Sequence, residues 1–137
     1  SDVNVVSSVV RSGQTDTPFG RFLAPGLDDG SPVDILIRPQ HLKIDRDRGG
    51  EGPRPSAENG LPARGRVARA RFMGSESLIE VVMEHDGSLL RATVPGAWTP
   101  AAGEALWLSF RRDRCHVFPA ERAHPAAGEA PFARAAE

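Results

Sequence analysis

The chain has 137 residues, which is enough for one domain of ordinary size. Hydrophobic residues make up 39 % and charged residues 26 %, a balance that excludes a fully disordered protein. Seventeen basic and eighteen acidic residues leave a formal net charge of −1, so no strong overall field favours nucleic acid or an anionic membrane. No apolar run reaches the roughly 20 residues of a membrane-spanning helix.

The first half of the chain is divided into short segments by glycine and proline. Residues 3–10 are β-branched and predict a strand, and residues 17–23 predict its return partner in a hairpin after a polar turn. Residues 33–38 predict another strand, which Pro39 ends because proline lacks an amide hydrogen. A short strand over residues 42–44 is predicted to follow.

The second half contains the clearer strand patterns. Residues 45–61 are rich in charge, glycine and proline, and we expect a solvated, flexible loop there. Beyond this loop, alternation of apolar and polar residues predicts strands around 68–72, 79–84, 88–94, 105–110 and 115–118.

Short strands separated by glycine and proline turns predict an all-β barrel or sandwich. Residues from 119 onward are rich in Ala, Pro and Glu. We therefore expect one domain over residues 1–118 and a disordered tail over 119–137, with a short helix over 130–137 as the alternative.

Two residues that occur once exclude whole classes of chemistry. Lys43 is the only lysine and lacks the glycine-rich approach of a phosphate-binding loop, which argues against nucleotide hydrolysis by this chain. Cys115 is the only cysteine, so an internal disulfide and a multi-cysteine zinc site are excluded, and a reducing cytoplasmic setting fits. As a nucleophile, Cys115 would need a positioned base, and only three nearby arginines accompany it in sequence: Arg111, Arg112 and Arg114.

The acidic and histidine residues show no catalytic pattern. Glu76, Glu80 and Glu84 lie among strand-forming residues, and we expect them on a solvated face. The four histidines lack metal-ligand spacing, and we expect structural or surface roles for them: His41, His85, His116 and His124. We therefore predict no enzyme activity, no metal site and no cofactor in this chain.

The arginines leave two binding functions open. Arg66, Arg69 and Arg71 follow one predicted strand, next to Arg64, and a basic groove on a β-barrel is one way to bind single-stranded nucleic acid. The absence of Tyr and the negative net charge weigh against nucleic acid. A small-molecule module would instead hold an oxyanion or metabolite against Arg38 or Arg66. Our candidate ligand or interface residues are Arg38, Arg66, Arg69 and Arg71.

One segment of the sequence resembles a known family: residues 35–42, Ile-Leu-Ile-Arg-Pro-Gln-His-Leu. This string resembles an Ile-Arg-Pro-Glu segment in the C-terminal regulatory region of ATP-binding subunits from bacterial ABC importers. The motif falls on Ile37, Arg38, Pro39 and Gln40, where Gln40 replaces the usual Glu and puts in doubt any ion pair made by that carboxylate. Segments 4–6, 17–20, 65–78, 103–108 and 116–118 agree with the same family in order and spacing. The chain thus resembles the transport-associated OB (TOBE) domain over residues 3–119.

The resemblance implies an OB-like β-barrel with an additional N-terminal strand pair and no chemistry of its own. It implies a cytoplasmic domain, peripheral to the inner membrane, that contacts its own ATPase domain and a second copy of the subunit, with importer membrane subunits as partners of the parent protein. ATP and Mg²⁺ would bind in an ATPase domain outside this chain. Residues 74–78, with their spacing to residues 116–118, resemble ferric-iron importer subunits most, whereas polyamine, sulfate and sugar importers share the architecture.

Overall fold

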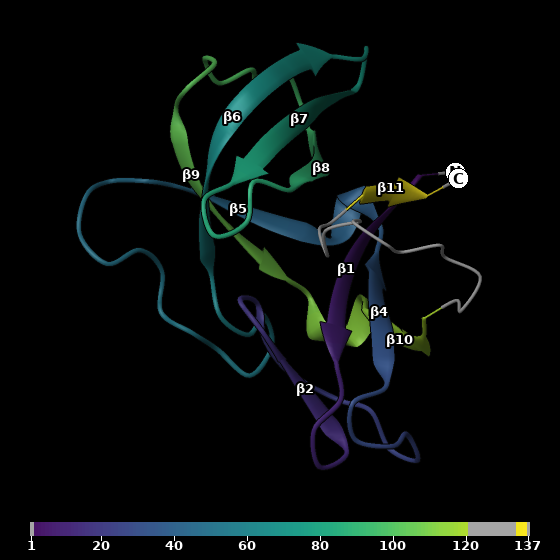
Figure 1. Cartoon of the computed structure of the whole chain (residues 1–137). Coiled ribbons are helices and arrows are strands. Elements are labelled where there is room, and N and C mark those ends of the chain that lie inside the picture. The colour runs from purple at the N-terminus through teal and green to yellow at the C-terminus, as the bar shows by residue number, and fades with distance from the viewer. Residues whose placement is uncertain (1, 121–133, 137) are drawn as a thin grey trace.

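A computed structural model describes residues 2–120 and 134–136 of the chain (Figure 1). Eleven strands and two single-turn 3₁₀ helices make up this part: β1 (Val3–Val9), β2 (Gln14–Thr17), β3 (Gly20–Leu23), β4 (Pro32–Ile37), η1 (Pro39–His41), β5 (Leu42–Arg46), β6 (Ala63–Phe72), β7 (Glu76–Met83), β8 (Leu89–Pro95), β9 (Ala105–Phe110), η2 (Arg112–Arg114), β10 (His116–Pro119) and β11 (Arg134–Ala136). Neither helix in this part of the chain has the length and apolar character needed to cross a membrane.

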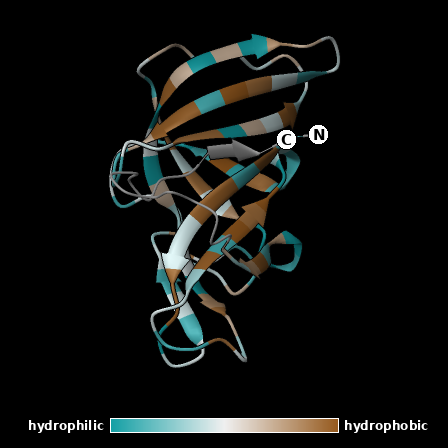
Figure 2. Ribbon diagram, turned by 45° about the vertical axis from the view of Figure 1, so that its right-hand side comes forward, coloured by the Kyte–Doolittle hydropathy of each residue, from teal (hydrophilic) through white to brown (hydrophobic). Residues whose placement is uncertain are grey.

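The largest unit is a five-stranded antiparallel sheet in the order β5-β9-β6-β7-β8, which curls on itself (Figure 1). On β7, Ile79, Val81 and Met83 point inward and are fully buried, as alternation along a strand requires. Figure 2 shows this alternation as brown and teal bands along the strands of the sheet. The predicted all-β, OB-like fold is confirmed.

The second sheet has four strands in the order β10-β4-β1-β11. Its central strand β4 buries Val33, Ile35 and Ile37, all at 1 % exposure or less. Strand β1 pairs with β4 from Asn4 opposite Ile37 to Val9 opposite Pro32.

The hairpin predicted between residues 3–10 and 17–23 was wrong. Strand β1 pairs with β4, whereas β2 and β3 pair only with each other, and the additional strand pair is therefore β2-β3. The Thr17 hydroxyl closes their turn: it accepts from the Phe19 amide at 2.9 Å and donates to the Gly20 carbonyl at 2.8 Å. The turn directs Phe19 into the core, where its ring stacks on Phe110 with centroids 4.1 Å apart. This aromatic contact stabilises the turn.

The predicted loop begins later than expected, because Asp45 and Arg46 belong to β5. Most of the loop is exposed, but contacts attach it to the domain. Asp47 accepts from Arg64 at 2.7 Å, and a Cβ added at Gly52 would lie 2.5 Å from the Trp107 ring.

Two parts of the predicted disordered tail belong to strands in the structure. Pro119 completes β10, and Arg134–Ala136 forms β11 against the start of β1, rather than a disordered segment or a helix. The rest of the predicted tail, residues 121–133 and 137, lies outside the described residues.

Asn4 joins the two sheets. This side chain is only 1 % exposed, and both of its polar atoms bond to Arg91 on the edge strand β8: its amide nitrogen donates to the Arg91 carbonyl at 2.8 Å, and its oxygen accepts from the Arg91 amide at 2.9 Å. Buried polar groups are stable only when paired in this way.

Candidate functional site

A β-bulge on β6 sets the direction of the candidate arginines. The register between β6 and β7 shifts between Val67 and Arg69, so an extra residue is inserted into β6. Arg69 then lies opposite Glu80 and Arg71 opposite Leu78, on the same face as Arg66. The bulge thus brings three of the four candidate residues to the outer face of the five-stranded sheet.

Two of these three arginines form ion pairs with glutamates. Arg69 bonds Glu80 at 3.1 Å, and Arg66 bonds Glu84 at 3.3 Å and the Gly103 carbonyl at 3.2 Å. Glu80 also receives Arg91 from β8 at 2.9 Å. The expectation that Glu80 is solvated was wrong: it is 8 % exposed, because the arginines on both neighbouring strands cover it.

The other two arginines near the bulge, Arg64 and Arg71, differ from each other in their partners. Arg64 lies between Asp47 at 2.7 Å and Glu84 at 2.9 Å, and its hydrogen bond lowers the pKa of Asp47. Arg71 has no ion pair with any residue that the structure describes and is exposed. Three of the four arginines around β6 are thus bound to carboxylates, which lowers their capacity to hold an external anion.

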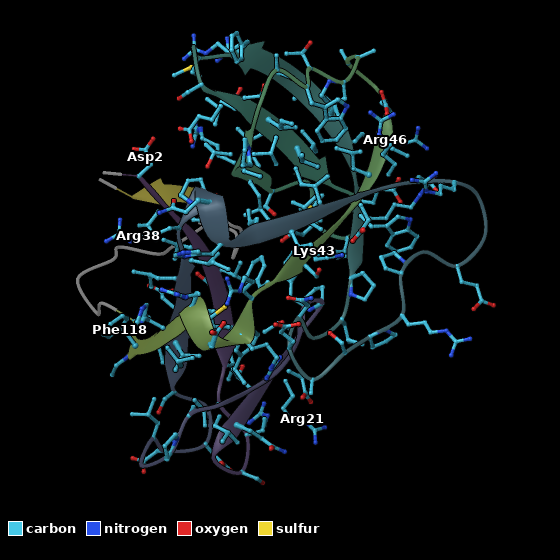
Figure 3. The ribbon with its side chains drawn as sticks, turned by 180° about the vertical axis from the view of Figure 1, so that it is seen from behind. Asp2, Arg21, Arg38, Lys43, Arg46 and Phe118 are labelled. Atoms are coloured by element: carbon cyan, nitrogen blue, oxygen red, sulfur yellow. The ribbon has the colours of Figure 1, made fainter. Side chains whose placement is uncertain are left out.

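The family motif surrounds η1, which packs against β8. Ile37 is buried at the end of β4, Arg38 precedes the helix, and Pro39 begins it, where a missing amide hydrogen costs nothing. Gln40 is exposed. Arg38 and Gln40 line an open cavity of about 490 Å³, and Figure 3 shows Arg38 on the same side of the molecule as Asp2. Arg38 thus lies at a cavity that it shares with Asp2 and Glu76, whereas Arg66, Arg69 and Arg71 lie along β6.

The histidines and the cysteine are not assembled into a reactive group. His41 is half-buried with its Nδ1 unbonded, and burial followed by the charges of Arg114 and Arg111 lowers its pKa. Burial raises the pKa of the Cys115 thiol to about 12, which keeps it protonated and unreactive.

The remaining histidines in the described part are separate from these two. His85 packs edge-on against Phe19, and His116 stacks on Phe118. His124 lies outside the described residues, and within them no three His, Cys, Asp or Glu side chains gather as metal ligands.

A cleft that the sequence did not indicate opens between the β2-β3 pair and residues 55–61. Its volume is about 590 Å³, and apolar side chains form much of its wall: Pro55, Ala57 and Leu61. Arg21 and Arg112 also line it. No sequence signal predicted this site, because residues 20, 60 and 112 meet only after the loop folds back onto β3.

Comparison with known proteins identifies the fold family. Residues 35–118, well over half of the chain, match the TOBE domain. The chain belongs to the TOBE domain family. No curated protein matches it.

Among solved structures, this TOBE domain is similar to the cytoplasmic molybdate-binding protein ModG, whose structure contains bound molybdate. The two share 9 % sequence identity with a TM-score of 0.58, and the similarity covers 85 % of this chain and 94 % of ModG. At that identity the similarity concerns the fold alone. The predicted TOBE family is thus confirmed, and the TOBE match includes all four motif residues, 37–40.

Proposed function

We propose that this TOBE domain is a non-catalytic regulatory and dimerisation module of an ABC importer ATP-binding subunit, with ferric iron as the favoured cargo. It would contact its own nucleotide-binding domain and a second copy of the subunit, on the cytoplasmic side of the inner membrane. ATP and Mg²⁺ would bind in the ATPase domain and not in this chain. Regulation by such a module requires only that it bind two states of the dimer with different affinity.

The observation that carries this proposal is the family membership, and the ion pairs on the outer face of the five-stranded sheet support it. Arg66 and Arg69 are bound to glutamates on the outer face of the five-stranded sheet, and Glu80 is held by arginines from both sides. A face with fixed, mutually paired charges supports contact with a complementary protein surface. The same face is a weaker site for a free anion, because the anion would have to displace a glutamate from Arg66 or Arg69.

The second candidate is an oxyanion-binding module, and the fold similarity to molybdate-binding ModG favours it. Of the two candidate residues for it, Arg38 lines a cavity, together with Asp2 and Glu76, and Arg66 lies on the outer face of the five-stranded sheet, where it bonds Glu84. Binding of single-stranded nucleic acid has less support, since a protein of net charge −1 gains little from the phosphate backbone.

Calorimetry and sedimentation of the 137-residue chain separate these candidates. The importer proposal predicts no saturable heat with molybdate, sulfate or ferric citrate, and weak self-association that rises when the chain is fused to its ATPase domain. Saturable binding of one oxyanion, lost in Arg38→Gln but retained in Arg66→Gln, would instead support the oxyanion module. Binding of single-stranded DNA that weakens steeply with salt would support the nucleic-acid function.

A further inference from the structure

Arg112 contacts both walls of the cleft between β3 and residues 55–61. Its backbone amide donates to the Glu58 carbonyl at 2.9 Å, which links η2 to the loop. Its guanidinium donates through Nη2 to the Arg21 carbonyl and lies over the Phe22 ring, 4.4 Å from the centroid. A cation fixed on an aromatic face in this way loses little side-chain freedom when it binds a further group.

Two glycines, Gly20 and Gly60, leave the space that the Arg112 guanidinium occupies. Gly60 has φ +68°, and a Cβ there would lie 2.5 Å from the Phe19 carbonyl oxygen and 3.0 Å from Arg112 Nη1. Gly20 has φ +108°, and its Cβ would also lie 3.0 Å from Arg112 Nη1. The backbone therefore approaches the guanidinium closely from both walls, which only glycine permits at these φ values.

Arg112 has no carboxylate partner among the residues that the structure describes. Within residues 2–120, no carboxylate lies within ion-pair distance of its guanidinium, whereas Arg21 on the same cleft bonds Asp16 at 2.8 Å. Arg21, Arg112 and Asp16 are the charged residues that line the cleft, so its walls carry one net positive charge. Only one guanidinium hydrogen is used, by the Arg21 carbonyl, which leaves donors for a ligand.

We propose that this cleft binds a small organic anion, a single carboxylate on a compact apolar body, with Arg112 as its counter-ion. A guanidinium offers two parallel N–H donors that match a carboxylate. Pro55, Ala57 and Leu61 would cover the apolar body, and about 590 Å³ is ample for a molecule of a dozen non-hydrogen atoms. An inorganic oxyanion would leave these apolar walls unfilled. The site does not depend on the proposed importer role.

Benzoate is a suitable probe, and its neutral isostere benzamide is the matched ligand control. In an amide-detected NMR titration of the full chain, benzoate at up to about 10 mM is expected to give saturable shifts at Gly20, Gly60 and Arg112. Benzamide is expected to give no comparable shifts, because it lacks the charge that Arg112 would bind. Sulfate at the same concentration should not displace benzoate.

Three variants test which residues contribute to benzoate binding. Arg112→Gln should weaken benzoate binding about tenfold or more, since a charge-assisted bidentate contact is lost. Arg114→Gln is the matched control on the same turn: its side chain is 53 % exposed and 4.0 Å from Asp113, and binding should be unchanged. Ala57→Trp, at an exposed position of the wall, should block the cleft while leaving Arg112 in place.

Three results would overturn the proposal: equal shifts with benzamide, displacement by sulfate, or benzoate binding that persists in a folded Arg112→Gln protein. If Arg112→Gln does not fold, Ala57→Trp decides the question, and retained binding in that variant contradicts the site. A failed titration would leave the importer proposal intact, because that proposal is tested by the polypeptide attached to this domain.

Discussion

The five-stranded sheet and the cleft end of the molecule are stabilised in different ways. The cleft end, which comprises β2, β3, residues 47–62 and η2, has few ladder hydrogen bonds and depends on individual contacts such as those of Thr17, Asp47 and Arg112. The sheet instead combines continuous backbone pairing with alternating buried residues. The difference indicates that backbone pairing stabilises the sheet throughout, whereas the cleft end is attached to the core by a few side chains such as Phe19 and Phe22.

The largest expected effect is a difference in the free energy of unfolding between substitutions on the two faces of the five-stranded sheet. Ile79→Ala removes a fully buried side chain and should lower the free energy of unfolding by about 3 kcal/mol, because it leaves a cavity in the core. Val82→Ala on the outer face of the same strand is the control: Val82 is 38 % exposed, and its loss should cost less than about 1 kcal/mol. Urea unfolding measures both, and equal losses would contradict the assignment of the buried face.

Asn4, which joins the two sheets, should be the position where a substitution has the next largest effect on the free energy of unfolding. Asn4→Ala leaves the Arg91 amide and carbonyl without a partner at the edge of β8, and we expect a loss of about 2 kcal/mol. Amide hydrogen exchange should show Arg91 exchanging faster, with β6 and β9 unaffected. Unchanged protection of Arg91 would mean that Asn4 does not hold the sheets together.

A smaller effect is expected at the cleft end. Gly60→Ala requires positive φ and places a Cβ against the Phe19 carbonyl, so it should cost about 1–3 kcal/mol. Gly26→Ala is the matched control, because Gly26 has φ +81° but open space around it, and pays only the backbone cost. If both variants lose the same stability, the close approach at Gly60 has no energetic weight.

The smallest expected effect is a pH dependence that arises at His41. Burial lowers its pKa below 6.5, so the unfolded chain takes up a proton that the folded state rejects. Stability should therefore fall as the pH drops through about 6.5 towards the folded pKa. His41→Gln should be less sensitive than the original protein when urea unfolding is compared at about pH 7.5 and about pH 5.5. An identical difference in the two proteins would show that other groups cause it.

Sequence reasoning succeeded where residue type and periodicity determine structure. The buried residues Ile79, Val81 and Met83 follow from simple alternation, and the string around Arg38 led to the TOBE family. It failed at Ala68, which was expected on the same face as Ala70 and Phe72 but is the extra, exposed residue of the bulge. A bulge depends on how two strands meet, which the sequence of one strand does not determine.

The cleft could not be predicted for a related reason. Gly20, Gly60 and Arg112 are far apart in sequence, and their proximity depends on long-range contacts such as the hydrogen bond from the Leu61 amide to the Phe19 carbonyl. The β1–β4 pairing, which replaced the predicted hairpin, is also long-range. Local turn signals favour neighbouring strands and do not report such pairings.

The importer proposal is tested most directly by the amino acids that precede Ser1 in the native polypeptide. The account predicts a nucleotide-binding core there, with a glycine-rich phosphate-binding loop, and ATP-dependent dimerisation of the whole subunit that weakens when residues 1–137 are removed. An unrelated preceding domain, or dimerisation that is unchanged without this TOBE domain, would contradict it.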